Sequence, residues 1–192
     1  MDSNWFICKT GTKAMKGACV TLRPLKQEDA EDLLNVHIQN KRFFERFSME
    51  RPQNYYTLSF QEHVIFQFNE LAKQGQEYHY AIWSNQSNQL VGVVDLFQVY
   101  RGPLQRAMIG YSVSQAENGK GYATEACRLL SEYAFTNLML HRLEAAVLPS
   151  NQASIRVLEK AGFIKEGTAK KSVRIHGTWE DHYIFACINP IH

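Results

Sequence analysis

A short glycine-rich turn, Asn118 to Thr124 (NGKGYAT), carries the residues whose types and spacing first suggest chemistry. Gly119 and Gly121 permit backbone angles, and a close approach of a ligand, that a side chain would block. Lys120 adds a positive charge between them. Successive N–H groups at a helix start, with the helix dipole, favour spread-out negative charge. The turn therefore predicts a site for a pyrophosphate.

The residues around this turn predict the elements that hold it. Met108 to Val113 is apolar and rich in strand formers, and small or apolar residues recur at helical spacing from Ala123 to Ala134. The segment thus reads strand, turn, helix. An ordinary helix start is the structural alternative. A dinucleotide site is another, although its third small residue would fall on Thr124; Glu144, after the next strand, keeps it open.

A second segment, NQAS at 151–154, follows a predicted strand, Leu143 to Leu148, and Pro149. Ser150 or Asn151 is well placed to cap a helix that buries apolar residues and closes at Gly162. On this structural interpretation Asn151 is a helix cap and Ser154 a residue of the first turn.

These two segments resemble the acetyl-CoA motif of the GNAT superfamily of N-acetyltransferases. The family signature falls on Asn118, Gly121 and Ala123, with Asn118 where Gln or Arg is usual. GKGYATEA and NQAS are typical of the Rim-type ribosomal-protein N-terminal acetyltransferases, and the resemblance extends from about residue 20 to 187. It implies an α/β (α+β) GNAT fold, in which helices flank a mixed, mostly antiparallel central sheet.

The resemblance also implies roles for individual residues. The co-substrate is acetyl-CoA, and no metal is expected. Asn151 would contact the pantetheine arm, and Ser154 would protonate the departing thiolate. An N–H late in the strand 108–113, at a β-bulge, would bind the oxyanion, by analogy that of Val113. The expected cofactor-binding residues are Val113, Asn118, Gly119, Lys120, Gly121, Tyr122, Ala123, Thr124 and Asn151.

The general base is the gap in this pattern. The family's carboxylate positions are vacant, with Met108 at one and AKKSV (169–173) at the other. Asp95 lies in an apolar stretch where a carboxylate is costly to bury without a partner, so it is either the base or a structural hydrogen-bonding group. Activation through ordered water is the remaining route. The histidines, including His37, His79 and His182, show no metal-ligand spacing and fit surface or packing roles.

The acceptor is expected to be a primary amine, either a protein N-terminal α-amine or a small-molecule amine. An α-amino group with a pKa near ~8 is closer to neutral at pH 7 than a lysine near ~10.4, so it requires less help from a base. Aromatic residues of two predicted helices line an acceptor cleft or belong to the core. The alternative function is a catalytically weak CoA-binding regulatory module, which the vacant base positions favour. The aromatic residues that line the expected acceptor cleft or belong to the core are Phe43, Phe44, Phe47, Tyr55 and Tyr56.

Composition agrees with one domain spanning residues 1–192, in which residues 1–17 are the least readable part. The chain has 192 residues, 45% of them hydrophobic, and a net charge of +2, which predicts no nucleic-acid or membrane partner. The four cysteines form no CxxC pair, and no run approaches the ~20 apolar residues of a membrane helix. We therefore expect a cytoplasmic protein; a homodimer stays open.

The remaining elements predict an antiparallel meander followed by two strand-helix units. This order argues against a doubly wound dinucleotide fold, which alternates strands and helices from its beginning. The expected elements are a strand at 18–23, helices at 27–47 and 58–73, a hairpin of 77–84 with 89–100, and a last hairpin of 168–172 with 183–187 that turns at His176 and Gly177.

Overall fold

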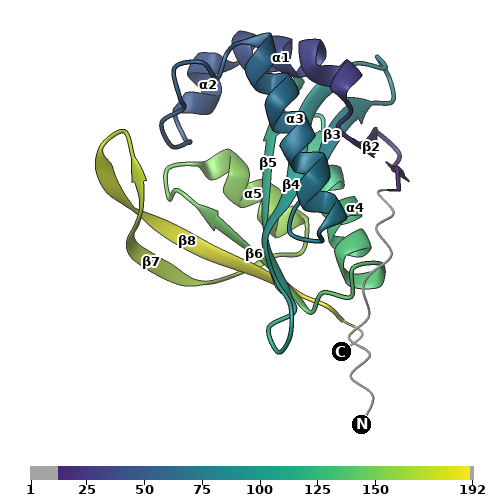
Figure 1. Ribbon diagram of the computed structural model, residues 1–192. Coiled ribbons are helices and arrows are strands. Elements are labelled where there is room, and N and C mark those ends of the chain that lie inside the picture. The colour runs from purple at the N-terminus through teal and green to yellow at the C-terminus, as the bar shows by residue number, and fades with distance from the viewer. Residues whose placement is uncertain (1–12, 191–192) are drawn as a thin grey trace.

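The computed structural model describes residues 13–190 (Figure 1). Strands and helices follow the expected order, and the tail forms one long hairpin. The elements are β1 (Met15–Lys16), β2 (Val20–Pro24), η1 (Gln27–Asp29), α1 (Ala30–Gln39), α2 (Lys41–Glu45), α3 (Leu58–Lys73), β3 (Tyr78–Ser84), β4 (Leu90–Tyr100), β5 (Arg106–Val113), η2 (Gln115–Glu117), α4 (Tyr122–Thr136), β6 (Arg142–Val147), α5 (Gln152–Lys160), β7 (Ile164–Ile175) and β8 (Thr178–Ile188).

The described residues form an eight-stranded mixed sheet in the order β1-β2-β3-β4-β5-β6-β8-β7. β5 and β6 are parallel, because α4 carries the chain back between them, and the other neighbouring pairs are antiparallel. A doubly wound parallel sheet is therefore ruled out, and with it the fold that the dinucleotide alternative requires.

Helices cover both faces of this sheet. Residues of β3 alternate between the two sides: Ile82 packs in the larger core beneath α4 and α5, whereas Ala81 packs in the smaller core beneath α1 and α3. Figure 1 shows α3 crossing the β3–β4 side in front, with α4 behind the sheet. None of the helices in residues 13–190 is long and apolar enough to cross a membrane.

The single helix expected over residues 27–47 is wrong. Asn40 interrupts it, with φ −108° and ψ 14°, and separates α1 from α2. Its buried side chain donates to the Val36 carbonyl over 2.8 Å, and its Oδ1 accepts from the Gln115 N–H over 2.8 Å. The chain bends here because an asparagine, which competes for backbone hydrogen bonds, ties the helix end to the segment before the glycine-rich turn.

The sheet opens between β5 and β6. Their register covers Arg106 to Met108 opposite Arg142 to Glu144 and stops there, although β5 continues to Val113 and β6 to Val147. Beyond these three pairs the two strands diverge. The divergence opens the middle of the sheet at the carboxyl ends of β5 and β6.

Candidate active site

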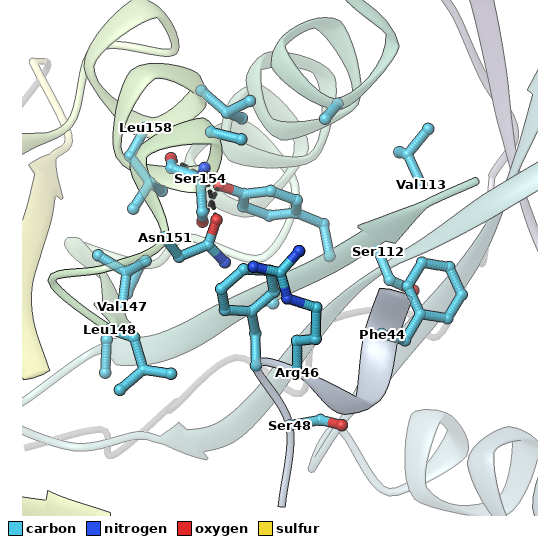
Figure 2. A pocket seen from close by; sticks show the side chains of 18 of the residues that line it. Phe44, Arg46, Ser48, Ser112, Val113, Val147, Leu148, Asn151, Ser154 and Leu158 are labelled. Atoms are coloured by element: carbon cyan, nitrogen blue, oxygen red, sulfur yellow. Dashed lines mark hydrogen bonds between the residues drawn. The ribbon is translucent and has the colours of Figure 1, made fainter. Parts of the chain in front are cut away.

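A cavity of about 480 Å³ occupies this opening (Figure 2). Its walls come from β5, β6 and α5 on one side and from α2 with the loop after it on the other. Ser154 and Asn151 face it from the start of α5, and Phe44 and Arg46 face it from α2 and its end. Of the predicted site residues, Val113, Asn118, Ala123, Asn151 and Ser154 line it.

The glycine-rich turn has the backbone conformation that its sequence predicts. Gly119 and Gly121 adopt φ values of +83° and +82°, in the left-handed region that favours glycine, and Gly121 is the N-cap of α4. The first main-chain bond of α4 joins the Glu125 N–H to the Gly121 carbonyl over 3.0 Å. The preceding N–H groups, through Thr124, are therefore available to an anion at the helix start.

The side chains of the turn offer fewer free polar groups to an anion than its backbone N–H groups do. Lys120 Nζ lies 2.7 Å from Glu117 Oε2, so its exposed charge already has a partner. Tyr122 is buried, and its hydroxyl group bonds with Ser84 Oγ over 3.1 Å. Asn118 and Ala123 reach the cavity, whereas the residues between them and Thr124 lie outside its lining. The turn thus stands at one end of the cavity.

Glu125, which the sequence did not single out, fixes the start of α4. Its two carboxylate oxygens accept N–H bonds from the consecutive residues Ala18, Cys19 and Val20, over 2.7, 2.7 and 2.8 Å. Charge-assisted bonds of this kind are stronger than neutral ones. They hold the start of α4, after the glycine-rich turn, against the beginning of β2. The acidic residue in GKGYATEA was the available signal, but its partners lie over 100 positions away.

The strand ladder directs the Val113 N–H into the opening. Ser114 donates its N–H to the Val91 carbonyl over 2.8 Å, which makes these two residues a hydrogen-bonded pair of the antiparallel ladder. Gly92 and Val113 are the next pair, and in such a pair the N–H groups point away from the partner strand. The Val113 N–H therefore points away from β4, toward the side where β6 has diverged.

The expected bulge late in β5 is wrong. The register with β4 is continuous from Val113 to Met108, and the irregularity lies between Phe97 and Tyr100. No bulge is needed there, because the divergence of β6 already leaves that edge of β5 unpaired. The Val113 N–H points toward the opening without a bulge, so its oxyanion role stays a prediction.

Asn151 and Ser154 combine a structural role with exposure to the cavity. Asn151 Oδ1 caps α5 by accepting the Ser154 N–H over 3.1 Å. Ser154 Oγ lies 2.7 Å from the hydroxyl of Tyr111, which itself donates to the Ser154 carbonyl over 3.0 Å. Burial raises the pKa of Tyr111, while its bond with Ser154 lowers it less, so the phenol stays protonated. Sequence reasoning missed Tyr111 as the partner of Ser154.

Asp95 lies outside the cavity and has a partner. Its Oδ1 is 2.9 Å from His79 Nδ1, and His79 Nε2 is 2.8 Å from Glu77 Oε2. The imidazole stacks on Phe68, with ring centroids 3.4 Å apart. Burial lowers the pKa of His79, but Asp95 and Glu77 together raise it to about 9, so the ring carries a positive charge at pH 7. This geometry favours the structural interpretation of Asp95 over the base.

Charges on the cavity wall are all positive. Arg46 and Arg51 line it, and the lining includes no Asp, Glu or Lys. Arg46 forms no ion pair among the described residues, and its guanidinium group extends into the cavity in Figure 2. His182 also lines the cavity. Three of the predicted aromatic residues, Phe43, Phe44 and Phe47, do so as well.

The other two aromatic residues, Tyr55 and Tyr56, pack beside the cavity. Tyr55 bonds with His37 Nε2 over 3.2 Å, and Arg51 lies over the Tyr55 ring, 4.2 Å from its centroid. Burial and Arg51 lower the pKa of His37 to about 3, so this ring is neutral. Within residues 13–190, no group of three or more His, Cys, Asp or Glu side chains could hold a metal ion.

Comparison with known proteins agrees with this geometry. The family model described as "Acetyltransferase (GNAT) domain" matches residues 20–164. The chain is 49% identical, over 92% of its length, to 97% of the probable N-acetyltransferase YjcK of Bacillus subtilis. It is similar to the solved ribosomal-protein-S5-alanine acetyltransferase of Vibrio fischeri, with a TM-score of 0.88, 28% identity and coverage of 93% of this chain and 97% of that one.

A second solved structure, Mycobacterium smegmatis RimJ in complex with CoA-disulfide, also has a TM-score of 0.88, with 26% identity over 93% of this chain and 88% of that one. The match to the family model covers most of the chain, and the two TM-scores show that this chain shares the fold of these two structures. This protein therefore belongs to the GNAT family of acetyltransferases, has the GNAT fold and is an N-acetyltransferase.

Proposed function

We propose that this protein transfers the acetyl group of acetyl-CoA to the N-terminal α-amine of a protein, and that residues 1–192 act as one domain. The observation that carries the proposal is the cavity in the open sheet, with the glycine-rich start of α4 at one end and a Ser154–Tyr111 pair in its wall. A Rim-type relative of similar fold was solved with a CoA-disulfide. The Vibrio fischeri relative is named for acetylation of a ribosomal-protein alanine.

The reaction needs few groups. The amine nitrogen attacks the thioester carbon, the carbon–sulfur bond breaks, and CoA leaves as a thiolate while the nitrogen loses one proton. The Val113 N–H can donate to the oxyanion of the tetrahedral intermediate, as it points into the opening. Ser154 can return a proton to the thiolate, a group that leaves without much protonation because thiols are fairly acidic.

The charge of the cavity favours a protein N-terminus over a polyamine. A polyamine carries several ammonium groups, and the lining offers Arg46 and Arg51 but no carboxylate to receive them. Like charges in a partly desolvated site are unfavourable. A peptide brings one amine, and its backbone carbonyls can accept bonds from the guanidinium groups.

The test is acetyl transfer to a panel of peptides that begin with Ala, Ser or Met, with spermidine and free lysine as comparison acceptors. We expect turnover with at least one peptide α-amine and a much lower kcat/KM with spermidine. Spermidine as the best acceptor would contradict the choice of a protein N-terminus. Tight binding of acetyl-CoA without transfer to any amine would instead support the alternative of a CoA-binding regulatory module.

A further inference from the structure

The lining of the cavity includes one imidazole side chain, that of His182. The lining includes no Asp, Glu, Lys or Cys. The ionisable groups that do line it are two arginines, which stay charged, Tyr111, which stays protonated, and His182. Imidazole is the side chain that gains and loses its proton between pH 5 and 8.

The strand β8 aims His182 at the acceptor side of the sheet. Phe185 belongs to the larger core, and Tyr183 packs against it, on the side of α5. Because neighbouring side chains of a strand point to opposite faces, His182 points to the other face, which α1 to α3 cover. Its side chain is buried, with 5% of the residue exposed, yet it lines the cavity. The imidazole therefore faces the cavity and has little contact with bulk solvent.

A backbone contact fixes the tautomer of this ring. His182 Nδ1 lies 3.3 Å from the carbonyl oxygen of Glu180, and a carbonyl can only accept a hydrogen bond. The proton of the neutral ring is thus on Nδ1. Nε2 keeps its lone pair, and no described residue donates to it, so this nitrogen can accept a proton from a bound amine.

The charged groups around His182 leave its ring without a carboxylate partner. Arg46 and Arg51 share the cavity with it. Asp181, the next residue on β8, is bound elsewhere: its Oδ2 lies 2.7 Å from Lys170 Nζ and its Oδ1 accepts the Lys171 N–H over 2.9 Å. The arrangement differs from that of His79, which two carboxylates hold in its charged form.

We infer that His182 is the general base of the transfer, an assignment that rests on the function proposed above. As the bond from nitrogen to the acetyl carbon forms and the carbon–sulfur bond breaks, Nε2 takes the proton that the nitrogen must lose. CoA leaves as a thiolate, and the imidazolium then releases its proton to solvent. Ser154 on α5 and His182 on β8, which both line the cavity, thus serve the leaving group and the nucleophile.

The test compares wild type, His182→Gln and His63→Gln, a matched substitution at an exposed histidine of α3 that does not line the cavity. The kcat for the best peptide is measured from pH 5.5 to 9.5, with acetyl-CoA affinity by calorimetry. We expect His182→Gln to lower kcat at pH 7 by ~10²- to 10⁴-fold, to flatten its acidic limb and to spare acetyl-CoA affinity. His63→Gln is expected to match wild type.

A second variant guards against misfolding of the first. His182→Ala leaves a space that opens into the cavity, and added imidazole is expected to restore part of its kcat, whereas the far less basic pyrazole is not. Wild-type kcat and an unchanged acidic limb in folded His182→Gln would overturn the assignment, as would loss of that limb in Asp95→Asn instead. No transfer by wild type to any α-amine would overturn the proposed function itself.

Discussion

Replacing His79 by glutamine should remove a pH-dependent part of the protein's stability. Asp95 and Glu77 raise the pKa of His79 from 6.5 to about 9 despite burial, and only 9% of its side chain is exposed. At 1.36 kcal/mol per pKa unit, the shift corresponds to about 3 kcal/mol of unfolding free energy. Because the folded pKa is the higher one, this stabilisation is complete below pH 6.5 and is lost as pH rises toward 9.

The assay is urea unfolding of wild type, His79→Gln and Asp95→Asn at several pH values between 6 and 10. The difference between wild type and His79→Gln is the relevant quantity, since contributions of other titrating groups cancel in it. We expect that difference to shrink by about 3 kcal/mol across this range, and Asp95→Asn to show a weaker pH dependence than wild type. Parallel curves for wild type and His79→Gln would refute the ion-pair reasoning.

Three further predictions concern the active site. Gly121→Val places a β-branched residue at φ +82°, so acetyl-CoA affinity measured by calorimetry should fall ~5- to 150-fold, as expected for ~1–3 kcal/mol of backbone strain. Lys120→Ala should cost less affinity, because its exposed ammonium group is paired with a carboxylate, and equal losses would contradict the backbone site. Ser154→Ala should lower kcat by ~10²- to 10⁴-fold and spare acetyl-CoA affinity, and Tyr111→Phe should lower kcat less; an unchanged kcat in Ser154→Ala would exclude its role in thiolate departure. Glu125→Gln leaves one acceptor oxygen where two carboxylate oxygens bound three N–H groups. The melting temperature should therefore fall, and the KM for acetyl-CoA should rise at constant kcat. A change in kcat alone would argue against a role of Glu125 in positioning the start of α4.

Local patterns predicted the elements whose residues signal within one turn or one strand. α3 begins and ends where its apolar spacing predicts, because Thr57 caps it by accepting the Phe60 N–H. The turn between β7 and β8 falls at His176 and Gly177, which both adopt positive φ. The cap by Asn151 is similarly local, since its partner is three residues away.

Features that depend on tertiary contacts could not be predicted from the sequence. Asn40 breaks a helical pattern because its partner is Gln115, 75 positions away. The sequence around Asp95 does not predict its ion pair with His79, which lies opposite it on the neighbouring strand. The sequence predicts only a surface or packing role for His182. The sheet places it in the lining of the same cavity as Phe44 of α2, and its role as the base stays a proposal.

The divergence of β5 from β6 leaves this protein with a set of amides whose deuterium uptake should report on cofactor occupancy. The N–H groups of Tyr111 and Val113 share one edge of β5 beyond its last pair with β6, in the middle of a sheet rather than at its border. Exchange at such amides is slowed when a ligand covers them or accepts their hydrogen bonds. Mass spectrometry of exchanged peptides could therefore follow filling of the site without any acceptor substrate.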